Sequence, residues 1–518
     1  MAEQIQVSAK HKVFAVPFSS ALKNILPDAR EYGGKLLVPH TVDTTRLARN
    51  LGYQVPSPLI AQYDWAGDKP FRTQKLTASM LCMNARAYVL SEMGTGKTRA
   101  TLHAINYLIQ SGNVSRVLVV APLSTLSIVW DAEVFNHFPW LNVGVLHGTK
   151  AQRLKILSED KHIYVINHAG IEVIQKELMA RKDIQAVVVD ELGEYRNART
   201  NRWKALNLFC QGKKYVWGLT GSPMPKAPTD AYAQCKLLTP HTVPKYFREF
   251  KMRTMRQITQ FRWVEQPNAK DIVYECMQPA VRFTRDECVE LPPVSYVGRQ
   301  VDLSIEQKKT HDALIAKAIA AASEGVITAV NEGVLFTKIL QVACGWVYTS
   351  GDINSRKVVD LSPTPRLNAL LGVLEETPSK VIVFVDFVHC ADRVYEFLQN
   401  SGVDCALVTG STSKSDRDAT FHAFQNTSAP RVLVAHPKCM AHGLTLTAAS
   451  TIVWYTPTVA LDTYEQACAR ITRPGQKQKQ LLVHLTATKT EAKLYRRLQA
   501  RASLQGALLE MFALGELE

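Results

Sequence analysis

The stretch Ser91-Glu-Met-Gly-Thr-Gly-Lys-Thr98 decides the fold, because it joins an apolar run, AYVL, to a helical pattern, RATLHAINYLIQ. A strand, a glycine-containing loop and a helix start aim backbone N–H groups and the positive end of the helix dipole at phosphates. We predict that Lys97 reaches the β- and γ-phosphates of ATP and that the Thr98 hydroxyl binds Mg²⁺. The loop residues predicted to bind ATP are Met93, Gly94, Thr95, Gly96, Lys97 and Thr98.

Two carboxylates, Asp190 and Glu191, follow the apolar run AVVV further along the chain. A carboxylate at the C-terminal end of a strand can hold Mg²⁺, and its neighbour can polarise the attacking water. We therefore predict that Asp190 binds the metal ion and that Glu191 is catalytic.

Arginines suited to phosphoryl transfer lie in Glu465-Gln-Ala-Cys-Ala-Arg-Ile-Thr-Arg-Pro-Gly-Gln476. Planar guanidinium groups stabilise the charge that develops on the transferred phosphoryl group. Two arginines three residues apart on a helix share one face, so the spacing predicts that Arg470 and Arg473 point in one direction.

Short β-branched runs alternate with helical stretches in two groups, one at residues 116–223 and one at residues 380–457. Near-continuous apolar strands are typical of parallel sheets that helices cover on both faces. We predict an α/β fold with two tandem RecA-like parallel-sheet lobes and a small N-terminal α+β module. The expected domains are the module at 1–62, the first lobe at 66–295 with a helical insertion at about 240–290, and the second lobe at 300–518.

The 518 residues carry a formal net charge of +15, with 46% hydrophobic and 21% charged residues. The composition is that of a globular chain, and the excess of Lys and Arg favours a polyanionic partner. The ten cysteines include no C-x-x-C pair, which favours reduced thiols over structural zinc. No apolar run reaches the roughly 18 residues that span a bilayer, and no signal-type core follows the first residues. We therefore expect a cytoplasmic protein without a membrane partner.

The order of these motifs resembles the Swi/Snf family of superfamily-2 helicase-like ATPases over about residues 66–500. Further motifs carry the resemblance: Phe71-Arg-Thr-Gln74, APLSTLSIVWDAEVFNHF at 121–138, Leu219-Thr-Gly-Ser-Pro223, Glu290-Leu-Pro-Pro293, Leu303-Ser-Ile-Glu-Gln307, Thr337-Lys-Ile-Leu-Gln341 with Cys344, His442-Gly-Leu-Thr-Leu-Thr-Ala-Ala449 and the segment from Gln466 to Gln476. The resemblance implies that Gln74 contacts adenine and that Gln466 joins the two arginines in catalysis.

The resemblance also implies that the backbone of DNA is gripped by loops that follow strands. The candidate nucleic-acid contacts are Ser124, His147 and Thr220 in the first lobe, and Phe387, Thr412, Lys438 and His442 in the second. Ligands of open α/β sheets bind at such loops.

Three of the motifs contain departures from the expected pattern. Ser91 stands where the phosphate loop usually begins with glycine, and Leu192-Gly193 follows the Asp-Glu pair where the family commonly has Ala-His or Ser-His. The usual histidine that couples the nucleotide site to DNA is therefore missing. Thr445 replaces an asparagine and keeps a side chain that can form hydrogen bonds.

Two further segments bear on substrate choice. Residues 1–62 resemble the substrate-recognition module that precedes the motor in annealing helicases, and Lys23, Arg30, Lys35, Arg46 and Arg49 are its candidate phosphate contacts. A unit this small buries little apolar surface, so we expect it to dock on the first lobe. Residues 243–263 mix basic and aromatic side chains, which favours either a nucleic-acid grip or an insertion that packs on the lobe.

The function predicted is an ATP-dependent translocase on double-stranded DNA that remodels forked or branched DNA by fork regression, branch migration or strand annealing. The cofactors expected are ATP and Mg²⁺, and the setting is DNA repair, replication or recombination, with proteins of those processes as possible partners. The chain is expected to be a monomer from a phage or bacterium, acting in the host cytoplasm if it is phage-encoded. The alternatives are a strand-separating helicase for DNA or RNA and a catalytically silent DNA-binding scaffold.

Overall fold

The structure is a computed structural model, and it divides into two compact units, Met1–Val289 and Glu290–Glu518. The residues that it describes are 5–26, 28–65, 70–224, 227–259, 263–288, 294–323, 329–348, 358–440, 445–473 and 476–500. The motif Glu290–Pro293 and the candidate contact His442 lie outside these ranges.

The first unit contains a seven-stranded parallel sheet, which we call the first lobe together with its helices. The strand order is β13-β5-β10-β9-β6-β8-β7. The strands are β5 (Arg86–Val89), β6 (Arg116–Ala121), β7 (Val143–Leu146), β8 (Ile163–Asn167), β9 (Ile184–Asp190), β10 (Tyr215–Leu219) and β13 (Ala280–Val281). The helices are α4 (Arg72–Met83), α5 (Lys97–Gln110), α6 (Ala132–His137), α7 (Lys150–Ser158), α8 (Gly170–Val173), α9 (Gln175–Ala180), α10 (Asn201–Cys210), α11 (Ala231–Leu238), α12 (Phe247–Thr254), α13 (Ala269–Cys276) and α14 (Arg285–Cys288).

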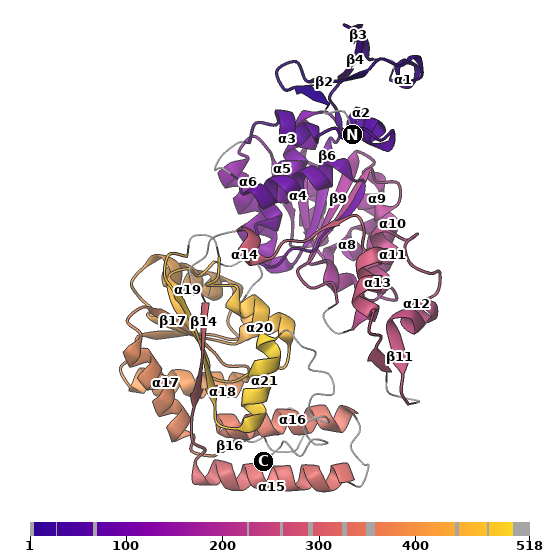
Figure 1. Cartoon of the computed structure of the whole chain (residues 1–518). Helices are drawn as coiled ribbons and strands as arrows, with labels where there is room; N and C mark the ends of the chain where they lie inside the picture. The colour runs from indigo at the N-terminus through magenta and orange to yellow at the C-terminus, as the bar shows by residue number, and fades with distance from the viewer. Residues whose placement is uncertain are drawn as a thin grey trace. The chain divides into compact units, whose positions relative to one another are not determined.

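Helices cover both faces of this sheet, which explains the near-continuous apolar strands (Figure 1). Val117 and Val119 of β6 belong to the apolar cluster that includes residues of α4 and α5. Leu118 and Val120 belong to the opposite cluster, which includes residues of α10 and α11. Because side chains alternate along a strand, every residue of β6 except the first is buried.

A four-stranded antiparallel sheet with the order β1-β2-β4-β3 precedes the first lobe. Its elements are β1 (Gln6–Ser8), β2 (Val13–Pro17), α1 (Ser20–Ile25), β3 (Arg30–Tyr32) and β4 (Lys35–Pro39), followed by α2 (Val42–Asn50) and α3 (Pro58–Gln62). Gly33 and Gly34 have positive φ angles and form the turn between β3 and β4. Phe14, Val16, Leu36 and Val38 form the core of this small unit.

The small unit docks on the first lobe, as the sequence predicts. Arg46 of α2 donates from Nε to the carbonyl of Met83 at 2.8 Å and from Nη2 to that of Cys82 at 2.9 Å. Both acceptors lie at the C-terminus of α4, where helix carbonyls lack partners within the helix. Val42, Leu59 and Tyr63 join the same apolar cluster as α4 and α5. Arg49 donates to the carbonyl of Val55.

The second unit contains a six-stranded parallel sheet with the order β14-β21-β20-β17-β19-β18, which we call the second lobe together with its helices. Its strands are β14 (Val294–Gln300), β17 (Lys380–Phe384), β18 (Cys405–Val408), β19 (Val432–Ala435), β20 (Ala449–Trp454) and β21 (Gln480–Thr486), with a separate pair β15 (Trp346–Tyr348) and β16 (Val358–Asp360). The helices are α15 (Ile305–Ser323), α16 (Ala329–Cys344), α17 (Thr364–Glu376), α18 (Val388–Asn400), α19 (Lys414–Asn426), α20 (Leu461–Cys468) and α21 (Lys489–Gln499).

Hydrogen bonds of Gln307 link the motif at 303–307 to the motif at 337–344. Its backbone amide donates to the Ser304 hydroxyl at 3.1 Å, and its side-chain oxygen accepts from the Ser304 amide at 3.0 Å. Its Nε2 then donates to the carbonyls of Val342 and Ala343 at 2.8 and 3.0 Å. One buried glutamine therefore supplies hydrogen-bond partners to backbone groups at the start of α15 and at the end of α16.

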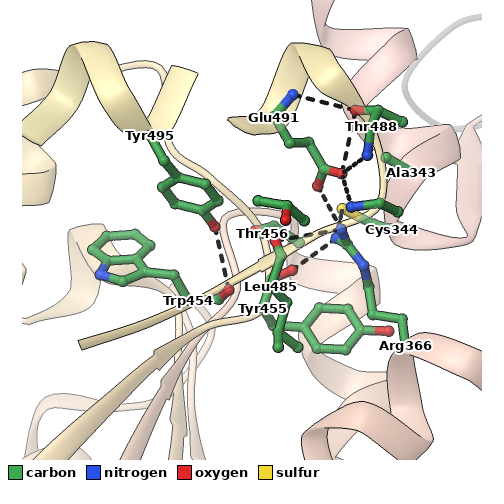
Figure 2. Close-up of polar contacts among 12 residues, drawn as sticks. Ala343, Cys344, Arg366, Trp454, Tyr455, Thr456, Leu485, Thr488, Glu491 and Tyr495 are labelled. Atoms are coloured by element: carbon green, nitrogen blue, oxygen red, sulfur yellow. Dashed lines mark hydrogen bonds and ion pairs between the residues drawn. The ribbon is translucent and has the colours of Figure 1, made fainter. Parts of the chain in front are cut away.

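A buried ion pair holds the second lobe together (Figure 2). Arg366 of α17 and Glu491 of α21 are 1% and 0% exposed, and Nη2 lies 2.6 Å from Oε1. The guanidinium also donates to the carbonyl of Tyr455 at 2.8 Å, and the carboxylate accepts from the amides of Ala487 and Thr488 at 2.8 and 3.2 Å. The carboxylate raises the pKa of Arg366 despite its burial. Hydrogen bonds from the backbone therefore support both charges, although Nε of Arg366 is buried without a hydrogen-bond partner.

Two structural findings concern membranes and thiols. Among the described residues, helices that combine the length and the apolar character of a membrane span are absent. The ten cysteines are free thiols, and nine of them are buried while Cys405 is half-buried.

Candidate functional site

The candidate site of the first lobe lies at one edge of its sheet. β5, β10 and β9 are neighbouring parallel strands, so their C-terminal ends meet at the same edge. The phosphate loop follows β5, the Thr220 loop follows β10, and Asp190 with Glu191 ends β9. Residues separated by about a hundred positions in sequence are thereby brought together.

The phosphate loop has the backbone that its sequence predicts. Gly96 precedes α5 with a φ of 76°, a left-handed conformation that favours glycine. Lys97 Nζ donates to the carbonyls of Ser91 and Glu92 at 2.9 and 3.0 Å, and Thr95 Oγ1 donates to Glu92 at 2.8 Å. The lysine side chain therefore lies over the loop, within reach of any anion that the loop binds.

Gln74 lies directly against this loop. It is 5% exposed, and its Oε1 accepts from the backbone amide of Phe71 at 2.9 Å at the start of α4. A Cβ added to Gly96 would overlap the Gln74 amide. The φ angle therefore favours glycine at this position, and a larger residue would also have to displace the Gln74 amide.

The departure at Ser91 has a structural explanation. Its hydroxyl accepts from the backbone amide of Phe283 at 3.0 Å, and the carbonyl of Phe283 accepts from the amide of Glu92 at 3.0 Å. Phe283 continues the line of β13, which is the strand that borders β5. Ser91 therefore ties the phosphate loop to the segment that leads to the second unit.

The Asp190 and Glu191 pair has an unusual backbone. Glu191 has a φ of 51° and a ψ of 55°, the left-handed region that a residue with a side chain rarely adopts. Asp190 Oδ1 accepts from the Glu191 amide at 3.0 Å, and Oδ2 accepts from Trp130 Nε1 at 3.0 Å. Strain of this kind concentrates at functional sites. Trp130 could not be predicted as the partner of Asp190, because the two residues are sixty positions apart.

The loop after β10 lies close to the position of the missing histidine. A Cβ added to Gly193 would lie 3.5 Å from the carbonyl oxygen of Ser222 and 3.8 Å from Thr220 Oγ1, which are ordinary contact distances. A side chain at 193 would therefore touch this loop. Thr220 is 2% exposed, and its hydroxyl accepts from the Ser222 amide at 3.2 Å. In this structure Thr220 shapes the loop and does not present its side chain to solvent.

The other two predicted contacts of the first lobe follow neighbouring strands. Ser124 lies in a short 3-10 turn, Leu123–Thr125, after β6, and it is half-buried. His147 directly follows β7 and is exposed. Both residues lie at the same sheet edge as the phosphate loop.

The arginine segment of the second lobe differs from the prediction. Helix α20 contains Gln466, which is half-buried, but the helix ends at Cys468, so Arg470 and Arg473 lie in the turns beyond it. The expectation that they share one helical face is wrong. Arg470 is 1% exposed, and its carbonyl accepts from the amide of Leu446 at 3.0 Å. The backbone leaves the helix here because this segment packs against the loop before β20.

Arg473 is half-buried, and hydrogen bonds hold its guanidinium. Its Nε donates to the carbonyl of Ala469 at 2.9 Å, and its Nη1 donates to Thr445 Oγ1 at 3.3 Å. Thr445 therefore supplies a hydrogen bond from the position where the family has asparagine. Gln476, which is 6% exposed, donates to the carbonyl of Ala449 at 2.8 Å and fixes the far end of the segment.

The predicted nucleic-acid contacts of the second lobe lie along one edge of its sheet. Phe387 follows β17, Thr412 follows β18 and Lys438 follows β19, and these three strands are parallel neighbours. Lys438 is exposed, Phe387 packs partly on the core, and Thr412 Oγ1 accepts from the Thr409 amide at 3.0 Å.

Asp386 is a titratable residue at this edge that the sequence did not single out. Burial raises its pKa to about 6, and Lys438 opposes that rise. His436 Nε2 lies 3.8 Å from Asp386 Oδ1, and burial lowers the pKa of His436. The sequence could have indicated it, since Asp386 follows the apolar run VIVFV as Asp190 follows AVVV.

These features define a class of protein. An all-parallel sheet with a phosphate loop after one strand and an acidic pair after a nearby strand, followed in the chain by a second parallel-sheet lobe, is the architecture of the superfamily-2 nucleic-acid-stimulated ATPases.

Comparisons with known proteins give the family. The SNF2-related domain matches residues 76–344, just over half of the chain, and the helicase conserved C-terminal domain matches residues 365–475. The chain belongs to the SNF2-related family. ATPases of this family use ATP, normally with Mg²⁺.

Individual relatives are distant. The chain is 23% identical to the ISWI chromatin-remodeling complex ATPase CHR17 of Arabidopsis thaliana over 82% of this chain and 40% of that protein. It is 24% identical to the putative protein p41 of Acyrthosiphon pisum secondary endosymbiont phage 1 over 84% of this chain and 97% of that protein. It is similar in fold to the Sulfolobus solfataricus SWI2/SNF2 ATPase core in complex with dsDNA, with 20% identity, a TM-score of 0.42, and coverage of 87% and 94%. The chain spans about 40% of the length of the plant remodelling ATPases that it matches.

Proposed function

We propose that the chain is an ATP-dependent translocase on double-stranded DNA. The observation that carries the proposal is the meeting of the phosphate loop with Asp190 and Glu191 at one sheet edge, in a chain of the SNF2-related family. The excess of 15 positive charges supports a polyanionic partner.

The residues of the first lobe fit a nucleoside triphosphate with Mg²⁺. Gly96 leaves the helix start open, Lys97 supplies a charge over the loop, and Thr98 and Asp190 are the oxygen donors that Mg²⁺ prefers. Bound Mg²⁺ neutralises charge on the phosphates. The hydrogen bond from Trp130 orients the Asp190 carboxylate, and the Asp190 oxygen fixes the strained amide of Glu191.

Glu191 is the residue that we assign to the attacking water. A carboxylate that orients or deprotonates water contributes about 10²–10⁴-fold in rate. It directly follows β9 in a left-handed backbone conformation, at the sheet edge that also carries the phosphate loop. Arg470 and Arg473 are proposed to act on the transition state, Gln466 to assist them, and Gln74 to contact the base.

We further propose that the substrate is forked or branched DNA, which would place the chain in DNA replication, repair or recombination. Support comes from the N-terminal sheet, whose second face is open. Lys12, Arg30, Tyr32 and Lys35 line a concavity of about 1170 Å³ on this face, together with the small residues of β2. Arg46 docks the unit on α4, Arg49 donates to Val55 within the unit, and Lys23 Nζ lies 3.8 Å from Glu31 Oε2. The phosphate contacts proposed here are therefore Lys12, Arg30 and Lys35. Similarity to a phage protein supports action in the cytoplasm of a host cell.

The first experiment compares ATPase rates without nucleic acid and with single-stranded DNA, duplex DNA, RNA and forked DNA. The proposal predicts the largest stimulation with duplex or forked DNA. Stimulation by single strands alone indicates a strand-separating helicase. Absence of ATP hydrolysis under every condition indicates a silent DNA-binding scaffold.

The second experiment tests the branched substrate. A deletion of residues 1–62 would remove Val42 and Leu59 from the core of the first lobe, so point substitutions are the sharper test. The triple substitution Lys12→Ala, Arg30→Ala and Lys35→Ala is expected to leave duplex-stimulated ATPase within about twofold and to reduce fork regression about tenfold, the loss of roughly 1.4 kcal/mol of fork affinity. Unchanged fork regression refutes the role of this face.

A further inference from the structure

An arm of the first lobe carries surface chemistry that the proposed function does not use. It comprises α12 and the hairpin of β11 (Met255–Gln257) and β12 (Trp263–Glu265). In Figure 1 these elements extend beyond the end of α13, away from the parallel sheet of the same lobe. We call residues 245–259 and 263–265 the basic arm.

One side of the basic arm fixes it to the lobe. Phe250 and Thr254 of α12 are 0% exposed, and Phe250 belongs to the core cluster that includes residues of α11 and α13. Phe247 lies edge-on to Tyr232 with ring centroids 5.4 Å apart. Lys251 Nζ lies 3.8 Å from the centroid of the Trp263 ring and so joins the helix to the hairpin. The arm therefore has a defined position on the first lobe.

The other side of the arm is positively charged. Lys245, Arg248, Arg253 and Arg256 are exposed, against the two exposed carboxylates of Glu249 and Glu265. Among the described residues, none of these four cations forms an ion pair with a carboxylate. Elsewhere in the same lobe, Lys150 pairs with Glu177 and Arg202 pairs with Glu194.

Exposed apolar side chains lie among these cations. Tyr246, Met252 and Ile258 are 59%, 59% and 51% exposed. A cationic surface with exposed aromatic and apolar groups suits a partner that offers phosphates beside flat apolar faces. Of the two alternatives that the sequence left open, packing on the lobe is seen at Phe250, and the nucleic-acid grip stays a prediction.

We propose that the basic arm binds the phosphate backbone of DNA as a contact separate from the loops at the sheet edges. The proposal rests on the proposed function only in taking DNA as the partner. Duplex DNA presents one negative charge per about 1.7 Å of helix axis. Several cations on one short arm can therefore contact phosphates at the same time. Three of the four are arginines, whose planar groups match phosphate oxygens in pairs.

The test is the salt dependence of duplex binding by the full chain. Each phosphate contact contributes about −0.9 to the slope of log K against log salt for duplex DNA. The triple substitution Arg248→Ala, Arg253→Ala and Arg256→Ala is expected to reduce the magnitude of this slope by about 2 to 3. ATPase without DNA and the melting temperature are expected to stay unchanged, because all three side chains are exposed. Replacement by three lysines is expected to restore most of the slope.

The matched control is Lys155→Ala, Lys176→Ala and Lys182→Ala, which removes the same charge from exposed positions elsewhere on the first lobe. The slope of log K against log salt for this variant is expected to differ from that of the natural protein by less than about 1. Equal slopes for the two triple variants would overturn the proposal for the arm and leave the translocase proposal standing. Loss of binding to anionic lipid vesicles without a change in the DNA slope would also overturn it. Absence of DNA binding by the natural protein would instead reject the proposed function.

Discussion

The two lobes carry similar parallel sheets but hold their functional charges in different ways. In the first lobe, Lys97 begins α5 after the glycine of the phosphate loop, and Glu191 directly follows β9 with a left-handed backbone. In the second lobe, Arg470 is 1% exposed and Arg473 is held by Thr445. Its best-connected charges, Arg366 and Glu491, are buried in the core. The comparison teaches that the first lobe is built to receive an anion and that the second holds its arginines in fixed positions.

The largest effect is expected in the first lobe. Lys97→Ala removes the charge over the phosphate loop and Glu191→Gln removes the carboxylate assigned to water, so both are expected to lower ATPase by at least about 10²–10⁴-fold. They differ in binding, because Glu191→Gln keeps the phosphate loop intact and should retain ATP. Turnover and nucleotide affinity, measured side by side, check this. Near-normal turnover in either variant would remove that residue from the proposed machinery.

The second prediction tests whether the arginines act on the transition state. Arg473→Ala is expected to lower the saturated ATPase rate by about 10³-fold or more with a smaller change in ATP affinity, as for arginine fingers. Thr445→Val removes one hydrogen bond that orients Arg473, worth about 1 kcal/mol, and is expected to lower the rate by about fivefold. If Arg473→Ala weakens ATP binding but leaves the saturated rate intact, the catalytic role fails.

The contrast between the lobes also explains what the sequence could predict. The phosphate loop depends on neighbouring residues and the φ angles of its glycines, so its geometry follows from a short motif. The edge shared by β5, β10 and β9 follows from parallel strands that alternate with helices.

Other features depend on contacts between distant residues. The end of α20 at Cys468 is set by packing against the loop at Leu446, which a helical spacing of arginines cannot reveal. The partnership of Trp130 with Asp190 and the use of Arg46 in docking are likewise tertiary contacts. The role of the basic arm could not be decided from the sequence, because residues that pack on the lobe and exposed cations alternate along it.

The third prediction concerns stability of the second lobe. Glu491→Gln leaves the Arg366 charge buried without its carboxylate, and the loss of one partner of a buried pair costs about 3–5 kcal/mol. The control is Arg299→Ala, which breaks the Arg299–Glu376 pair on the surface of the same lobe and is expected to change stability by less than about 1 kcal/mol. Urea unfolding of the variants measures the difference. Equal effects would show that the buried pair does not stabilise the lobe.

The smallest effect is a pH dependence. Burial lowers the pKa of His103 in the first lobe and of His484 in the second to about 4. The unfolded chain binds a proton near pH 6.5 and the folded chain does not, so stability falls as the pH drops through the window from 6.5 to 4. Each histidine is expected to lower the free energy of unfolding by about 2 kcal/mol at pH 5 relative to neutral pH.

His484→Gln isolates the contribution of the second lobe. Its loss of stability between pH 7.5 and pH 5.0 is expected to be about 2 kcal/mol smaller than that of the natural protein. An identical loss in both proteins would contradict the assignment of His484 as a neutral buried residue.

The central claim is ATP-driven movement along duplex DNA, and displacement of a third strand from a triplex tests it most directly. We expect the natural protein to displace the third strand only with ATP and to leave the two duplex strands paired, and we expect Lys97→Ala to displace none. Separation of the duplex strands, or failure to displace the third strand while duplex DNA stimulates ATP hydrolysis, would contradict it.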